Sequence, residues 1–367
     1  MPLPTIQQLA FSKVKGMTPD TAADILAVVG SEAEFFRMSE RELTELADVN
    51  SKIFSAAYRE QLLMEAEAEL EFVEQNGIRC MYFRNADYPA RFQNVPDAPL
   101  VLYAKGEADF DAKYMVGVVG TRHATLYGQG LTRSLVAGLG NLLGKDVCIV
   151  SGLAYGIDVA AHLAALENGM PTIAVVAHGL DMIYPAQHRS VAAEMVHRGG
   201  AIATEYGNHT RVHRSNFLAR NRIVAALCDC TVVVESAFKG GALVTARVAQ
   251  GYGRDVFAFP GRVKDEYSEG CNALIRKNVA ALISSASDLT EMMGWRRIAK
   301  PVEKSLFPEL TAEEQSVVDV MKGREVVQIN ELSVLSKHPV HRLLSILFEL
   351  EFKGMVSVLP GNCYRLV

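Results

Sequence analysis

The fold of this chain follows from the stretch Val116-Gly-Val-Val-Gly-Thr-Arg-His-Ala-Thr-Leu-Tyr-Gly128. An apolar run breaks at Gly120, a short polar turn follows, and from Gly128 onward apolar residues recur at helical spacing. The pattern predicts a buried strand, a tight turn and a helix, the first unit of a parallel α/β sheet. The turn offers backbone N–H groups, the positive end of a helix and the cation of Arg122, which together make an anion site. Because the fingerprint G-x-G-x-x-G is not in register, we interpret the turn as a phosphate-binding loop without assigning it to NAD.

Strand and helix patterns alternate from about residue 115 to residue 290. This alternation predicts a doubly wound parallel sheet. Two short strands are expected ahead of it, one beginning at Gly77 and one within residues 97–106. The strands expected in the sheet are Met115–Val119, Val147–Val150, Thr172–Ala177, Ala201–Thr204, Thr231–Glu235, Val256–Phe259 and Ala281–Ser284.

The composition is that of a soluble globular protein with two or three domains. Of the 367 residues, 49% are hydrophobic and 22% charged. No apolar run reaches membrane-spanning length and the first residues do not form a signal peptide, so we expect a cytoplasmic protein with no membrane partner. The six cysteines are scattered without a C-x-x-C pair, which favours reduced structural thiols over disulfides or zinc. No metal and no cofactor is expected.

The net charge of −5 argues weakly against nucleic acid, but the charge is unevenly distributed. Residues 1–80 carry a net charge of −7, residues 81–299 carry +3 and residues 300–367 carry −1. The acidity therefore belongs mainly to the N-terminal part, and the middle of the chain can still present a basic face.

Residues 1–80 are expected to form a helical domain of the SAM or helix-hairpin-helix kind. Thr18 followed by Pro19 is a helix start, and Ser39 with Glu42 has the spacing of a capping box. Such hairpins can grip DNA phosphates, but the acidic surroundings favour a structural or partner-binding role.

Residues 81–296 are expected to form a Rossmann-like domain, residues 297–309 a linker with Pro301 and Pro308, and residues 310–367 a C-terminal domain. The last of these combines three helices with a hairpin, which is typical of a winged helix. Its candidate recognition helix has Arg342 and Lys353 against Glu349 and Glu351, so a partner-binding or structural role is favoured over DNA binding.

Three turns that follow strands could each receive an anion. They lie at residues 120–122, 151–152 and 239–241, and we expect them at one rim of the sheet. A row of such turns suits a line of phosphates better than a single phosphate. Arg262 and Lys264 add cations nearby. The residues predicted to bind from these segments are Gly120, Thr121, Arg122, Ser151, Gly152, Lys239, Gly240, Gly241, Ala242 and Lys264.

The segment from His209 to Val224 is rich in arginine and has no acidic residue between its cations. Guanidinium groups match phosphate oxygens, and Phe217 offers a face on which a base can stack. Asn221 could bond a loop or a base edge. A helix is expected to begin near Ser215. The alternative is a charged helix face paired to acids elsewhere. The arginines of this segment are Arg211, Arg214, Arg220 and Arg222, of which Arg214, Arg220 and Arg222 are predicted to neutralise phosphates.

Two further pairs leave alternatives open. Asp158 and His162 are four residues apart on one helix face and could act as a catalytic pair, but a structural role is favoured because no third partner is evident. Glu205 and Glu235 follow strands and could do acid–base chemistry or hold loops through backbone N–H groups; we favour the second.

A resemblance to a known family rests on motifs that stand here in order. They are Val-Gly-Thr-Arg from Val119, Ser-Gly-Leu-Ala-x-Gly-Ile-Asp from Ser151, Gly-Leu-Asp-x-x-Tyr-Pro from Gly179, Phe-x-x-Arg-Asn-Arg from Phe217, Gly-Ala-Leu-Val-Thr-Ala from Gly241, and Pro-Gly with Gly-Cys-Asn-x-Leu-Ile from Pro260. With them, residues 85–290 resemble the bacterial DNA-processing protein family DprA, also called Smf.

The resemblance implies an extended Rossmann fold, binding of single-stranded DNA, homodimers, loading of RecA recombinase onto incoming strands in natural transformation, and no established catalytic activity. It implies that Arg122 grips phosphate, that Arg214 and the segment Arg220-Asn-Arg222 line the strand, and that Phe217 meets a base. The chain departs from the family at Thr121, usually Ser, at Tyr206, often Pro, and at Lys239-Gly-Gly-Ala, where Ser-Gly-Ser is common.

We therefore predict a sequence-blind, salt-sensitive binder of single-stranded DNA that is not an enzyme. The alternative is a nucleotide phosphoribohydrolase-like Rossmann enzyme, in which Glu235 or Glu205 and the turn Gly240-Gly241 would cleave an N-glycosidic bond. A weaker third possibility is a small-nucleotide sensor whose winged helix acts on a partner.

Overall fold

The computed structural model describes residues 3–47, 51–295, 310–359 and 361–366. They fall into two compact units, Met1–Ile298 and Ala299–Val367. The expected linker at 297–309, with Pro301 and Pro308, lies outside the described residues. Nowhere in the described ranges is there a helix with the length and apolar character needed to cross a membrane.

The first unit begins with a helical module whose starts follow its capping residues. Thr18 accepts the N–H of Thr21 with Pro19 in the first turn, and Ser39 and Glu42 bond each other's backbone N–H groups, as predicted. The helices are α1 (Ile6–Ser12), α2 (Pro19–Val29), α3 (Glu32–Arg37), α4 (Glu40–Ala47) and α5 (Ala56–Gln75), with a short 3₁₀ helix at Lys52–Phe54.

The module packs directly on the edge of the sheet. Phe11, Phe35 and Val73 share one hydrophobic core with Tyr82 and Tyr103 of the first two strands. The boundary expected at residue 80 falls inside the first strand, so the helices and the strand edge are built as one body.

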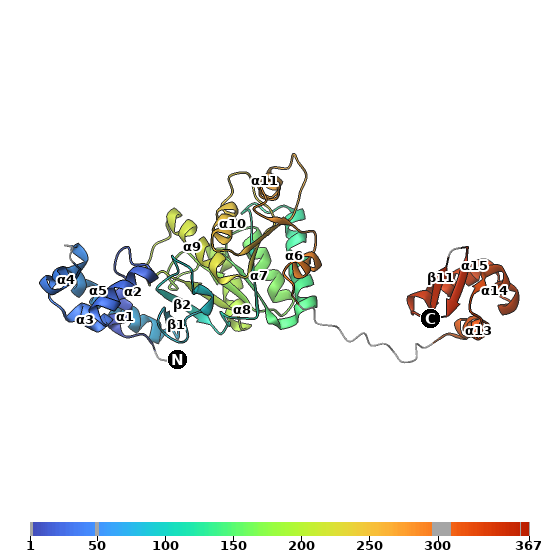
Figure 1. Ribbon diagram of the computed structural model, residues 1–367, viewed down its shortest axis with the longest axis horizontal. Coiled ribbons are helices and arrows are strands. Elements are labelled where there is room, and N and C mark those ends of the chain that lie inside the picture. Colours follow the sequence, from blue (N-terminus) through green and yellow to red (C-terminus); the bar gives the residue numbers. More distant parts are fainter. Residues whose placement is uncertain (1–2, 48–50, 296–309, 360, 367) are drawn as a thin grey trace. The chain divides into compact units, whose positions relative to one another are not determined.

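The sheet of this unit has the order β1-β2-β6-β5-β4-β3-β7-β8-β9. Figure 1 shows β1 and β2 next to the helices of the N-terminal module. Strands β3 to β9 pair in parallel, as predicted, while β1 and β2 form an antiparallel edge. The expected strands are found, although several end one or two residues early where the chain turns into rim loops. Their bounds are β1 (Arg79–Tyr82), β2 (Val101–Gly106), β3 (Tyr114–Val119), β4 (Val147–Ser151), β5 (Thr172–Val175), β6 (Ala201–Thr204), β7 (Cys230–Val233), β8 (Asp255–Ala258) and β9 (Ala281–Leu282).

Helices cover both faces of the sheet, because successive side chains of a buried strand point to opposite faces. In β3, Met115 and Val119 join the core under one set of helices, whereas Val116 and Val118 join the core under the other. The first set is α9 (Arg214–Leu227), α10 (Ala242–Gly251) and α11 (Glu269–Arg276); the second is α6 (Leu126–Leu143), α7 (Ile157–Glu167) and α12 (Ala286–Met292). Helix α8 (Arg189–His197) packs on the outer strands, and 3₁₀ turns lie at Ala90–Phe92, Gly144–Asp146, Ala186–His188 and Glu266–Ser268.

The second unit is the predicted winged helix, with its own core around Val317, Leu332 and Leu347. Thr311 and Glu314 form a capping box at its start. A two-residue strand that sequence patterning missed completes a three-stranded sheet of order β10-β12-β11. The elements are α13 (Ala312–Met321), β10 (Val327–Gln328), α14 (Ile329–Ser336), α15 (Val340–Phe352), β11 (Val356–Leu359) and β12 (Cys363–Leu366).

Candidate nucleic-acid interface

The strand order reverses between β3 and β7, and the loops after these two strands meet there. In open α/β sheets, ligands bind beyond the carboxyl ends of the strands at such a switch point. The carbonyl of Glu235 accepts the N–H of Thr121 at 2.7 Å, and its buried carboxylate accepts the N–H and Oγ1 of Thr125 at 2.9 and 2.5 Å. Glu235 therefore fastens the two loops together, which is the loop-holding role that the sequence favoured for it.

The loop after β3 is pressed against the start of α7. A Cβ on Gly120 would lie 2.5 Å from a side-chain carbon of Ile157, and one on Gly156, whose φ is +77°, would lie 2.2 Å from the carbonyl oxygen of Thr121. Glycine is required at both positions because no side chain fits. With the backbone held this way, Thr121 is half-buried and Arg122 is exposed to solvent.

Arg122 lies over an aromatic side chain from a distant helix. Its guanidinium carbon is 5.2 Å from the ring centroid of Phe217 on α9, and the ring of Tyr184 lies 5.8 Å from the Phe217 ring at an interplanar angle of 56°. Tyr184 is 41% exposed. We call Arg122, Tyr184 and Phe217 the stacking cluster. It joins a cation for phosphate to aromatic rings for bases, the combination used by single-strand binders.

Tyr184 is not among the predicted binding residues, although it belongs to the motif Gly-Leu-Asp-x-x-Tyr-Pro that begins at Gly179. A buried histidine holds it in place. Nδ1 of His178 lies 2.8 Å from the carbonyl oxygen of Gly179, and Nε2 accepts the N–H of Tyr184 at 3.2 Å. This pattern requires the neutral ring, and burial lowers the pKa of His178 accordingly.

Helix α9 divides the arginine-rich segment into two halves. It starts at Arg214, one residue before the predicted start, and His213 caps it by accepting the N–H of Ser215 at 3.3 Å. Arg211 and Arg214 are exposed at this end, and Phe217 is half-buried one turn further on. These cations remain candidates for phosphate contacts.

Arg220 requires a correction, because it is 4% exposed and cannot reach a phosphate in solvent. Its Nη1 donates to the carbonyl of Val175 at 3.0 Å, and a Cβ on Gly152 would lie 1.5 Å from the same nitrogen. Burial lowers the pKa of Arg220, while the charge of Asp158 raises it. Burial likewise raises the pKa of Asp158, and Arg220 counters that shift. Arg220 therefore has a structural role.

Arg222 is also engaged inside the protein. It donates to the carboxylate of Glu205 and lies 3.9 Å from that of Asp97. Burial raises the pKa of Glu205, and Arg222 counters the shift. The predicted phosphate contact of Arg222 is therefore replaced by ion pairs, the alternative weighed for the arginine-rich segment. Asn221, between Arg220 and Arg222, is half-buried.

The turn after β4 differs from the turn after β3. Ser151 is fully buried and its Oγ donates to the carbonyl of Val118 at 2.6 Å, while Gly152 is buried beneath Arg220. The expectation of an anion site at residues 151–152 is therefore wrong, because the guanidinium of Arg220 already occupies the space over Gly152.

The turn after β7 remains open. Lys239 and Gly241 are exposed, and Gly241 has no atom within 4 Å of the place where a Cβ would be. Gly240 is half-buried against Ser236, and Ala242 begins α10 as a buried residue. Lysine and an uncapped helix start of this kind can receive an anion. Lys264 lies apart from this turn, where it lines a cavity of about 990 Å³ with Arg262, Tyr127 and Tyr267.

The pair Asp158 and His162 has the structural role that the sequence favoured. His162 is fully buried, and its Nδ1 lies 2.7 Å from Oγ1 of Thr172. Burial lowers the pKa of His162 to about 3, so the ring is neutral. Among the described residues no group of three His, Cys, Asp or Glu side chains could hold a metal ion.

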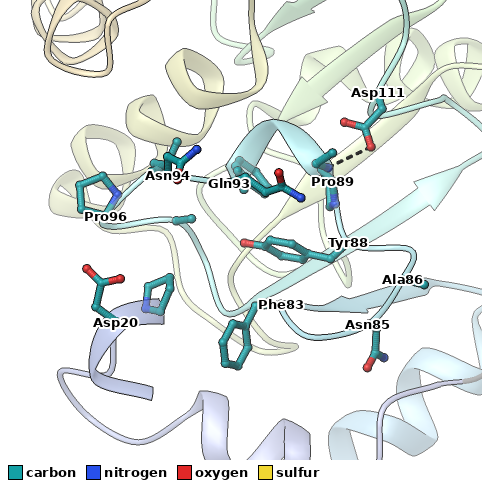
Figure 2. A pocket seen from close by; sticks show the side chains of 15 residues that line it. Asp20, Phe83, Asn85, Ala86, Tyr88, Pro89, Gln93, Asn94, Pro96 and Asp111 are labelled. Atoms are coloured by element: carbon teal, nitrogen blue, oxygen red, sulfur yellow. Dashed lines mark hydrogen bonds between the residues drawn. The ribbon is translucent and has the colours of Figure 1, made fainter. Parts of the chain in front are cut away.

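A separate cavity of about 650 Å³ lies between α2 and the segment 83–98 (Figure 2). Figure 2 shows Phe83 and Tyr88 among polar side chains, and Asp111, which accepts the N–H of Ala90 at 3.0 Å. The fifteen lining residues include Asp20 and Asp111 but no cation. This cavity is therefore unsuited to phosphates, and the cationic surface at the switch point is the better candidate.

Comparisons with known proteins identify the family of this chain. Residues 79–294 match the family model of DNA recombination-mediator protein A, and residues 303–362 match that of the DprA winged helix domain. Protein Smf of Escherichia coli (strain K12) is 33% identical over 313 residues, which are 82% of this chain and 80% of the relative.

Two solved structures are also similar. DNA processing protein A (DprA) from Streptococcus pneumoniae has a TM-score of 0.65 at 31% identity, over 79% of this chain and 98% of that chain. DNA processing protein A from Helicobacter pylori, whose structure concerns its mode of binding single-stranded DNA, has a TM-score of 0.52 at 30% identity, over 59% and 97% of the two chains. The chain belongs to the DNA recombination-mediator protein A family, that is, to the DprA (Smf) proteins.

Proposed function

We propose that this protein binds single-stranded DNA without marked sequence preference. The observation that carries the proposal is the stacking cluster at the switch point, with exposed Arg211 and Arg214 at the start of the same helix. Guanidinium groups neutralise phosphates and aromatic rings stack on any base, so the binding is sequence-tolerant. The relative from Helicobacter pylori, which binds single-stranded DNA, supports it.

The path of the strand is part of the proposal. The DNA backbone contacts Arg122 in the stacking cluster and, beside the cluster, Gly120, Thr121 and Arg214. Lys239 and the start of α10 offer a second anion position after β7. Lys264 extends the path across the neighbouring cavity. Four further residues hold these groups in place from inside the protein and do not touch DNA: Arg220, Arg222, Ser151 and Gly152.

We further propose that the protein acts as a homodimer in the cytoplasm, where it loads RecA recombinase onto incoming strands during natural transformation. It does so as a mediator and not as an enzyme. Both candidate catalytic carboxylates are engaged, since Glu235 holds Thr125 and Glu205 pairs with Arg222. That engagement favours the mediator over a phosphoribohydrolase-like enzyme.

Fluorescence anisotropy of labelled oligo-dT, against a duplex and against AMP, tests strand binding. We expect tight binding to the single strand, with log affinity falling by about 0.7 per phosphate contacted for each tenfold rise in salt. Arg214→Ala should weaken binding. Arg198→Ala is the matched control, because Arg198 is exposed in the turn between α8 and β6, at the amino end of that strand and not at the carboxyl ends where the stacking cluster lies. Release of free base from AMP, or no strand binding, would overturn the proposal.

RecA loading is tested separately, by the lag before RecA filaments form on single strands coated with a single-strand-binding protein. The wild type should shorten the lag and Arg214→Ala should not. An unchanged lag with intact strand binding would overturn the loading role alone.

A further inference from the structure

A hollow of about 370 Å³ lies between α10 and α11, beside the turn that follows β7. We call it the α10–α11 groove. Its floor is apolar, with Leu243 of α10 and Leu274 of α11, and its lining has three cations but no carboxylate. The cations are Lys239, Arg247 and Lys277. A volume of this size falls in the range of sites for small ligands, so the groove can admit one nucleotide.

The three cations of the groove are available to a ligand. Lys239, Arg247 and Lys277 are exposed, and none of them pairs with a carboxylate of the described residues. They differ in this from Arg222, whose guanidinium is taken up by Glu205. Three cations that gather at one hollow without an acid attract an anion. The groove therefore suits an anionic occupant.

An aromatic side chain lies at the edge of the same groove. Phe238 is 54% exposed and lines the groove directly before Lys239. Bases stack on aromatic rings, and arginine and lysine pair with phosphates. The groove thus repeats the combination of ring and cations found in the stacking cluster, on a different helix.

The groove also continues the proposed path of the strand. Lys239 and Gly240 line it and at the same time form the turn after β7, which offers the second anion position. Helix α10 packs against α9, which carries Phe217 of the stacking cluster, and lies between α9 and α11 (Figure 1). A strand that runs from the stacking cluster to Lys239 therefore arrives at the groove. This continuity favours DNA over an acidic protein segment as the occupant.

We propose that the α10–α11 groove holds the next nucleotides of the bound single strand. Phe238 stacks on a base, while Arg247 on α10 and Lys277 at the end of α11 pair with phosphates from the two sides of the groove. The inference rests on the proposed function and adds a second stacking position to it. A strand long enough to reach both positions is then held more tightly than a strand that reaches only the stacking cluster.

Fluorescence anisotropy of the full chain with two labelled oligo-dT probes, of about 6 and about 12 nucleotides, tests the groove. The double variant Arg247→Ala with Lys277→Ala should bind the shorter probe as the wild type does. With the longer probe, its slope of log affinity against log salt should fall by about 1.4, or about 0.7 for each of two lost phosphate contacts. The matched control is Arg133→Ala with Lys145→Ala, which removes the same charges from exposed positions on α6 and the turn after it. The control should change neither slope.

The stacking position is tested with the same probes. Phe238→Ala should weaken binding of the longer probe roughly tenfold, whereas Phe238→Tyr keeps the ring and should retain the affinity. Neither variant should alter binding of the shorter probe.

The outcomes separate this inference from the proposed function. Unchanged binding of the longer probe by the double variant would overturn the groove's role, assign it to another anionic occupant such as an acidic protein segment, and leave strand binding at the stacking cluster intact. An equal loss with both probes would also overturn it, because the cations would then act only through the general field of the protein. Failure of the wild type to bind either probe would overturn the proposed function and this inference with it.

Discussion

The turns after β3 and β4 have the same local pattern and opposite outcomes. Each follows a buried strand, contains glycine and leads into a helix. After β3 the loop turns outward, so that Arg122 reaches solvent over Phe217. After β4 the space above Gly152 is filled by the guanidinium of Arg220. The comparison teaches that a glycine turn becomes an anion site only where no side chain of the protein already occupies it. It also distinguishes Arg220, which supports the fold, from Arg122, which is proposed to bind DNA.

The largest expected effect is on stability, and it comes from removing the buried arginine, Arg220. Arg220→Ala removes a buried guanidinium that bonds the Val175 carbonyl and offsets the charge of buried Asp158, so we expect a loss of about 3–5 kcal/mol in the free energy of unfolding. Arg122→Ala, exposed at the other turn, should cost less than about 0.5 kcal/mol. Urea denaturation of the two variants measures both. Equal stability of Arg220→Ala and the wild type would refute the structural assignment of Arg220.

For binding of single-stranded DNA, we expect the larger loss at the exposed site after β3. Phe217→Ala removes the ring between Arg122 and Tyr184, and the loss of one stacked base should cost about 1–3 kcal/mol of binding free energy. Phe217→Tyr keeps a ring and should retain most of the affinity. Anisotropy with oligo-dT at one fixed salt concentration measures both variants. Full affinity in Phe217→Ala would place the strand elsewhere.

The pH dependence of stability tests the buried group His162. His162 has its pKa lowered to about 3 by burial, so the folded state stays neutral while the unfolded state takes up a proton below about pH 6.5. Stability is therefore complete above pH 6.5 and falls with pH, by about 2 kcal/mol at pH 5. Asp158, whose pKa is raised, acts in the opposite direction at lower pH.

The part due to His162 is the difference between the wild type and His162→Gln, measured by urea denaturation at pH 7.5 and pH 5. We expect the variant to lose less stability between the two pH values. The same pH dependence in both proteins would show that His162 is not the group responsible.

The smallest effect tests whether the N-terminal module supports the binding helix. Both carboxylate oxygens of Glu69 on α5 accept the N–H of Asn208 at 2.9 Å, in the loop that leads to α9. Glu69→Gln weakens this anchor, so strand affinity should fall by about 1 kcal/mol without loss of a DNA contact. Glu67→Gln on the same helix is the control. An unaltered affinity would show that the N-terminal module does not support the DNA-binding helix.

Much of the fold follows from local sequence patterns. The alternating strands and helices, the capping residues Thr18 and Thr311 and the winged helix are set by periodicity and hydrogen bonding within a few residues, which a sequence displays directly. The two-residue strand β10 was not predicted, because it is defined by its pairing with β12, which is distant in sequence. The motifs around Gly120 and Phe217 likewise indicated a cationic, aromatic site.

What only the tertiary structure decided is which cations face solvent. Three arginines on α9 look equivalent in sequence: Arg214, Arg220 and Arg222. Two of them are engaged inside the protein by residues of other elements. Arg220 bonds Val175 near the charge of Asp158, and Arg222 pairs with Glu205. Tyr184 joined the site in the same way, through a histidine and a loop remote from α9. The sequence by itself determined the elements and the kinds of chemistry available. Burial and charge pairing, which depend on residues far apart along the chain, decided where each side chain acts.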